Sequence, residues 1–201
     1  TAHAEPMGAG RDAPADIEAD SGCLSRTENT LFLEGNVRVS QGGNRTRSGS
    51  LALYFGADHS IGRAVFRDGF ELVAQGDTEA LGFSFPRASG RKTIRGRRLD
   101  VTFGANRALD EVSAGPEAEM IVEPGAQDVP ERREIRADSL TFKFTPEGKL
   151  REYLGTSGTS VRFIPLDPRA GEPRSISATD FVASLDPATG EAKNITFTEN
   201  G

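Results

Sequence analysis

The chain has 201 residues and a formal net charge of −6, with 24 Lys and Arg against 30 Asp and Glu. This balance argues against nonspecific nucleic-acid binding, which needs a concentrated positive surface. The single cysteine, Cys23, excludes an intrachain disulfide framework and a cysteine-cluster metal site. No stretch approaches the roughly 18 consecutive apolar residues of a membrane-spanning helix.

The chain begins with a segment that has no regular pattern. Residues 1–15 are rich in Ala, Gly and Pro, which predicts a disordered tail or linker. From residue 16 to residue 201, short segments with apolar residues at every second position follow one another. This period places the apolar side chains on one face of a strand. Because the alternate positions are mostly polar, the pattern indicates antiparallel sheet with one buried face.

Four of these segments form an internal repeat of a strand, a tight turn and a return strand. Gly, Asn, Asp and Pro follow each leading strand, at 56–58, 104–106, 146–148 and 187–190, and these residues favour hairpin turns. A recurrence at about 40 to 50 residues is typical of stacked units, none of which buries its apolar face alone. The leading apolar residues of the four units are Leu51, Leu99, Leu140 and Phe181.

An isoleucine precedes the leading residue in the last three units, at Ile94, Ile135 and Ile176. Each lies an odd number of residues upstream, so strict alternation would place it on the polar face. We predict a β-bulge in between that returns each isoleucine to the apolar side.

Helices are not expected. No window of about twelve residues or more shows the 3.6-residue helical period. Two Pro- and Gly-rich stretches, 124–133 and 165–174, indicate longer loops, and neither resembles a domain linker. We therefore predict a single all-β domain over residues 16–201, with little or no helix.

Residues suited to catalysis or metal binding are sparse, so we predict no enzyme activity, cofactor or metal. His3 lies in the predicted tail and His59 in a turn, which leaves one candidate base for a Ser-His-Asp triad. Carboxylates are plentiful, so a glycosidase pair stays open, although solvated carboxylates on polar strand faces explain them better. No group of His, Cys or acidic residues has the spacing of a zinc site.

One cluster places five cations just before a repeated strand: Arg91, Lys92, Arg95, Arg97 and Arg98. Such a patch suits phosphates or an acidic surface. Cations also keep strand edges soluble and block edge pairing, and we favour that interpretation. Cys23 is better explained as a small buried or tolerated residue than as a reactive one.

The repeated apolar face is the remaining candidate site. Its default explanation is an ordinary, filled core. A single curved sheet of hairpins, however, can enclose more space than its side chains fill, and the interior would then accept acyl chains. The residues expected to line such a groove are Val37, Val39, Leu51, Leu53, Phe55, Leu99, Val101, Phe103, Leu140, Phe142, Phe144, Phe181 and Leu185.

Several segments resemble the OstA-like periplasmic family, the LptA and LptC type components of lipopolysaccharide transport. Residues 31–42 (LFLEGNVRVSQG) are similar to a family strand pair, L-x-G-N-V-x-V-x-Q-G. Residues 17–20 (IEAD), 135–140 (IRADSL) and 176–181 (ISATDF) resemble a recurring I-x-A-D-x-L element. The likeness covers about residues 16–201, and residues 47–50 (RSGS) and 95–97 (RGR) depart from it.

The resemblance implies a twisted, open β-jelly roll whose interior shelters lipid A acyl chains during transport from the inner to the outer membrane. It implies a periplasmic location, either free or tethered to the inner membrane by a segment preceding residue 1. The implied partners are lipopolysaccharide and other jelly-roll proteins of the bridge, joined edge to edge, with head-to-tail self-association as a further option. The first and last strands would supply unpaired edges for such joining. The edge residues expected there are Ile17, Ala19, Ile195 and Phe197.

Two alternatives stay open. The chain could be a structural or adhesive β-repeat protein with a filled, ligand-free core. A polysaccharide-active enzyme on a β scaffold is the weaker alternative, because it requires two carboxylates that face one cleft.

Overall fold

The computed structural model describes residues 2–4, 15–75, 90–104, 107–126, 129–189 and 192–199, and for residues 2–4 it describes the backbone alone. Within these residues, seventeen β-strands form one sheet, and the described helical structure is a short 3-10 turn at Pro168–Ala170. The prediction of an all-β chain with little helix is thus confirmed. The strands are β1 (Ala2–Ala4), β2 (Ala15–Glu18), β3 (Ser21–Ser25), β4 (Thr30–Gln41), β5 (Asn44–Phe55), β6 (Ile61–Ala74), β7 (Lys92–Gly96), β8 (Arg98–Phe103), β9 (Leu109–Gly115), β10 (Ala118–Val122), β11 (Glu131–Ala137), β12 (Ser139–Phe144), β13 (Leu150–Thr156), β14 (Thr159–Pro165), β15 (Arg174–Ala178), β16 (Asp180–Leu185) and β17 (Ala192–Thr198).

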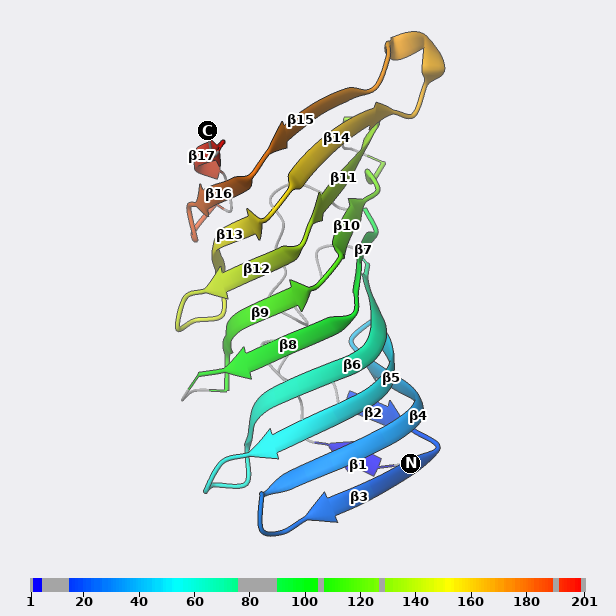
Figure 1. Ribbon diagram of the computed structural model, residues 1–201, viewed down its shortest axis with the longest axis vertical. Coiled ribbons are helices and arrows are strands. Elements are labelled where there is room, and N and C mark those ends of the chain that lie inside the picture. The colour runs from blue at the N-terminus through cyan, green and yellow to red at the C-terminus, as the bar shows by residue number, and fades with distance from the viewer. Residues whose placement is uncertain are drawn as a thin grey trace.

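The sheet folds along its length into two walls that share the long strands β4, β5 and β6 (Figure 1). In β6, residues 63–66 pair with β8, whereas residues 70–74 pair with β7. The β4–β5 pairing shifts register between Glu34 and Val37, where those strands pass from one wall to the other. We call the wall of β3, β8, β9, β12, β13, β16 and β17 the first wall, and that of β1, β2, β7, β10, β11, β14 and β15 the second wall.

After β6 the chain alternates between the walls through corners of one or two residues. Single residues, Arg97, Asp138 and Thr179, separate β7 from β8, β11 from β12 and β15 from β16. At another corner Ser157 and Gly158 both have positive φ, 61° and 81°, which turns the chain sharply between β13 and β14. One repeat unit is therefore a hairpin on the first wall followed by a hairpin on the second.

The hairpins of the first wall confirm the internal repeat. Their leading residues pair with the expected return strands, as in Leu51 with Phe66 and Phe181 with Phe197. Three of their turns are closed by the same backbone hydrogen bond, so the repeated turn residues build the same local structure. In that bond an N–H donates to a carbonyl over 2.8 Å, from Gly56 to Ser60, from Gly104 to Ala108 and from Thr145 to Lys149.

The odd isoleucine spacing has a different cause from the one predicted. No bulge lies between Ile94 and its leading residue; instead, a corner moves the chain to the other wall. The isoleucine and the leading residue then both point into the space between the walls. Ile94 and Ile135 are accordingly buried. Ile176 is 42% exposed, because β15 pairs with β14 on one side alone among the described strands.

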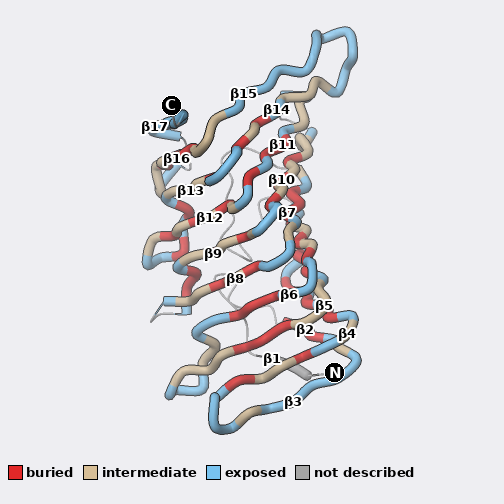
Figure 2. The backbone as a smooth tube through the Cα atoms, viewed as in Figure 1, coloured by how far each residue is buried: buried red, intermediate tan, exposed pale blue. Residues whose placement is uncertain are grey.

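The core is a continuous apolar cluster between the walls, drawn from alternate residues of both (Figure 2). Leu51, Leu99 and Leu140 of the first wall and Ile94 and Met120 of the second are at most 1% exposed. Burying a side chain of this size stabilises the fold by about 1.5–3 kcal/mol relative to leaving it in water. The inner faces therefore hold the walls together.

The N-terminal region includes strands within the predicted tail. Ala2–Ala4 form β1, which pairs antiparallel with Ala15–Ile17 of β2. Ala15 is fully buried, so the ordered fold includes the last residue of the range predicted to be a tail. Residues 5–14 lie outside the described residues.

Candidate functional site: an apolar trough

The residues predicted to line a groove gather on the inner face of the first wall and at its junction with the second. All of them belong to the buried cluster except Phe55 and Phe103, which are partly buried and pack against it. Phe142 stacks on Tyr153, with 6.3 Å between the ring centroids, and Tyr153 meets Phe181 edge-on at 5.2 Å. A role for this surface in lipid binding stays a prediction.

The second wall supplies the opposite side of the trough, and the groove residues predicted from the sequence miss most of it. Leu72, Ile94, Met120 and Ile135 all point inward and are buried. Alternation within 118–122 marks the inward face of β10. The sequence pattern does not show, however, that this face lies opposite the first wall, because that depends on the corners.

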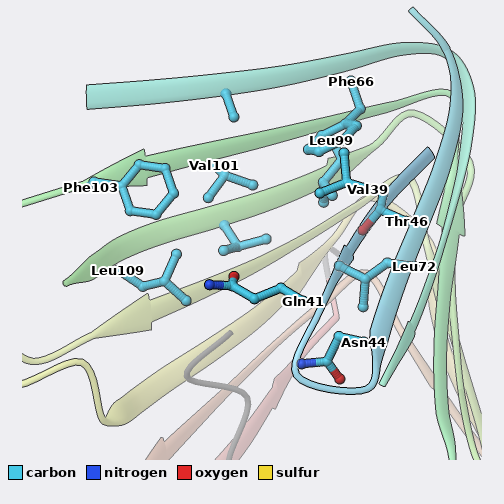
Figure 3. Close-up of a pocket in the computed structure, with 12 residues that line it drawn as sticks. Val39, Gln41, Asn44, Thr46, Phe66, Leu72, Leu99, Val101, Phe103 and Leu109 are labelled. Carbon is cyan, nitrogen blue, oxygen red and sulfur yellow. The ribbon is translucent and has the colours of Figure 1, made fainter. Parts of the chain in front are cut away.

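A small cavity lies between the walls where β4, β5, β8 and β9 face one another (Figure 3). Its volume is about 30 Å³, which leaves room for one to a few water molecules. This volume is far smaller than an acyl chain, so a chain enters this part of the trough only if the walls move apart. The lining is mostly apolar and includes Val39, Leu72, Val101, Phe103 and Leu109.

One end of this cavity is polar. Gln41, Asn44 and Thr46 line it from the β4–β5 hairpin, and each is at most 5% exposed. Figure 3 shows the amide groups of Gln41 and Asn44 on the cavity side of the hairpin. None of these three residues was predicted, because polar residues interrupt the apolar alternation that identifies an inward face.

The two lips of the trough, on the side away from the corners, differ in polarity. Strand register places Lys92, Arg133 and Arg174 in one row on the second wall, with an apolar residue between successive cations. Lys92 is 2% exposed, and the Arg174 guanidinium lies 2.7 Å from a Glu131 carboxylate oxygen. The facing row of the first wall is apolar, with Phe103, Leu109, Phe144, Leu150 and Leu185.

A positively charged side chain of the second wall affects the pKa of a tyrosine on the first wall. Burial raises the pKa of the Tyr153 hydroxyl, and the positive charge of Arg133 opposes that rise. Tyr153 stands on the first wall and Arg133 on the second, so the two walls interact electrostatically as well as by packing.

The predicted cation cluster is divided between the two faces of the sheet. Lys92 points inward and is buried. Three of the arginines form cross-strand or local ion pairs on exposed surfaces, with N–O distances of 2.7–2.9 Å. These pairs are Arg95 with Glu71, Arg97 with Glu117 and Arg98 with Asp100. Burial raises the pKa of the Asp100 carboxyl, but hydrogen bonds from Arg63 and Arg98 outweigh it and leave that pKa below its ordinary value. This arrangement favours a role in strand pairing and solubility over a phosphate patch.

Two of the four predicted edge residues lie on an edge strand, and two do not. Ile195 and Phe197 lie on β17, which pairs with β16 alone among the described strands, and they are 48% and 40% exposed. Ile17 differs from the expectation: it is 4% exposed, and β2 carries β1 on its outer side. Ala19 follows β2 and packs against the core. The described edges at the N-terminal end are β1 and β3.

The remaining candidate groups lie apart from the trough. His59 occupies a hairpin turn with φ of 61°, and Cys23 is exposed on β3. Among the described residues, no group of three or more His, Cys, Asp or Glu is arranged to hold a metal ion. Over the same residues, no helix is long and apolar enough to cross a membrane.

Comparison with known proteins gives a likeness of structure and no match of sequence. The sequence matches no protein-family profile, and no curated protein matches it. Among solved structures, the chain is similar to LptH, the LptA homologous periplasmic component of the lipopolysaccharide transport device from Pseudomonas aeruginosa. The likeness has a TM-score of 0.49 and 13% sequence identity, and it covers 66% of this chain and 78% of LptH.

Proposed function

We propose that this protein is a periplasmic carrier or bridge that shelters the acyl chains of lipopolysaccharide between its two walls. The observation that carries the proposal is that the two walls are joined along one side only within the described part of the chain. Corners join them along one side, and no pairing among the described strands joins them along the other. Walls joined along one side only could part along their length, and the apolar interior exposed in this way suits a long-chain amphiphile better than a compact solute.

The packed state of the trough defines how loading would occur. Parting the walls exposes Phe142, Phe144 and their neighbours to water, and an inserted acyl chain covers them again. The inserted chain also gains about 0.8 kcal/mol for each methylene that it buries, which opposes the cost of parting the walls. The short corners are the positions where the backbone would flex.

The free edges suit a multi-subunit bridge. At the C-terminal end, β15 and β17 each leave one side without a strand partner among the described residues, and both carry exposed apolar side chains. Strand addition at such edges would continue both walls into a neighbouring jelly roll. The OstA-like motifs of the sequence point to the same kind of assembly.

Site-specific photo-crosslinking tests the proposal. A crosslinking residue in place of Phe103 or Phe142, in the periplasm of a Gram-negative cell, should capture lipopolysaccharide. The matched control is Asp110, which follows the inward-facing Leu109 on β9 but is exposed. Absence of lipid at both inner positions, or equal capture at Asp110, would contradict the proposal.

The small cavity favours one alternative, a structural or adhesive β-repeat protein with a filled core. Native mass spectrometry of protein purified from a lipopolysaccharide-producing cell separates the two functions. Bound lipid supports the carrier, whereas lipid-free protein that self-associates supports the structural alternative.

A further inference from the structure

Asn44 is placed in the interior by a tight turn. Gly42 and Gly43 connect β4 to β5 and have φ values of 56° and 91°, the left-handed conformation that two-residue hairpins require. This turn fixes Gln41 and Asn44 opposite each other at the hairpin end. Alternation along β5 then directs Asn44 and Thr46 to the same, inward face.

The amide of Asn44 is buried without a hydrogen-bond partner. Its side chain is 3% exposed, and neither its nitrogen nor its oxygen has a partner within the part of the chain that the structure describes. Leaving a buried donor or acceptor unsatisfied costs about 1–3 kcal/mol. A buried amide of this kind needs an explanation other than stability, since an apolar residue of the same size would not incur the cost.

The surroundings of Asn44 define what could satisfy it. It faces a cavity whose other lining is chiefly aliphatic and aromatic, including Leu72, Val101 and Leu109. Asn offers two donors and one acceptor, so its complement is a group that both accepts and donates. With the walls parted, this part of the trough therefore suits a hydrocarbon chain that carries one such group at the level of the β4–β5 hairpin.

The geometry points to Asn44 as a specificity-determining residue that hydrogen-bonds a hydroxyl or amide group on the acyl chain of a bound amphiphile. This inference rests on the proposed function, because it assumes that a hydrocarbon chain occupies the trough. It adds that the trough distinguishes a substituted chain from a plain one. The substituent would also fix how far along the trough the chain lies.

Three short-chain probes of equal length test the inference: octane, 1-octanol and octanamide, titrated into the full chain and followed by NMR. The key variant is Asn44→Leu, which keeps the side-chain size and removes the amide. It should weaken 1-octanol or octanamide binding about tenfold and leave octane binding unchanged or tighter. Whichever polar probe loses more affinity identifies the substituent as an alcohol or an amide.

Two further measurements exclude a purely structural role. Without ligand, Asn44→Leu should raise Tm by roughly 2 to 10 °C, because the unsatisfied amide is gone. Asn194→Leu makes the same change on the exposed strand β17 and should alter none of the affinities. If Asn44→Leu does not fold, Asn44→Ala replaces it, with the same expected direction for the probes.

The outcomes separate this inference from the proposed function. If octane binds and Asn44→Leu changes all three affinities equally or not at all, the cavity end holds water only and the inference fails. A lower Tm for both Asn44→Leu and Asn44→Ala without ligand also contradicts it, because the amide would then stabilise the fold. If no probe binds the wild-type protein, the proposed function fails with it.

Discussion

Replacement of Phe142 by alanine tests the packed interior most directly. Phe142 is fully buried on β12 and stacks on Tyr153, so its removal leaves a large void between the walls. Phe→Ala substitutions in cores cost about 3–5 kcal/mol, which includes the lost transfer free energy and the cavity left behind. A domain of ordinary stability has about 5–15 kcal/mol in total, so the variant should lose a large share of its free energy of unfolding.

Urea denaturation followed by circular dichroism measures this loss. The matched control is Phe197→Ala, because Phe197 belongs to the same row of rings but is 40% exposed. It should cost less than about 1.5 kcal/mol, in line with its partial burial. The reasoning is refuted if the two substitutions cost the same, or if Phe142→Ala costs under about 1 kcal/mol, because the walls would then not be packed together around Phe142.

Three further predictions follow from individual contacts. A Cβ atom added at Gly155 would overlap the Phe181 ring, so Gly155→Ala should lower Tm by several degrees. The same change at Gly62, where the added atom would make only an ordinary contact of 3.9 Å, should not. The pKa of Asp100 is lower in the folded than in the unfolded protein, so the charged carboxylate stabilises the fold at neutral pH. The free energy of unfolding of the wild type should therefore exceed that of Asp100→Asn, and the difference should shrink as pH falls below about 4. A difference that is constant with pH contradicts this. Charged residues on the exposed edge should block strand addition, so Ile195→Lys with Phe197→Lys should reduce association measured by analytical ultracentrifugation more than Ile195→Ala with Phe197→Ala, which removes the same partly buried side chains without adding charge.

The first wall was predictable from sequence because its leading strands β8, β12 and β16 alternate strictly. Leu99, Val101 and Phe103 occupy every second position and are followed by a turn, and local rules of strand and hairpin formation suffice for such a segment. The second wall was not predictable in the same way. Ile94 and Ile135 were recognised as inward residues, but the corner that brings them inside is a change of direction at one residue, which leaves no distinct periodic signal.

The polar end of the cavity and the N-terminal edge were harder to predict for different reasons. Asn44 is a polar residue in a buried position, which contradicts the rule that locates buried faces. Ile17 is buried in the core cluster, and β1 pairs with the outer edge of its strand. Ala2–Ala4 have no alternation or β-branched residues that would indicate a strand. Both features arise from long-range packing and not from local sequence preference.

The corners of the sheet have a consequence for how such a protein can change in size. Each repeat adds one hairpin to each wall, so both walls lengthen together by about 10 Å, the width of two paired strands. Tandem duplication or loss of a repeat would thus alter the length of the trough and leave its cross-section intact. The number of repeats would then set the length that the protein spans, without any change to the rest of the fold.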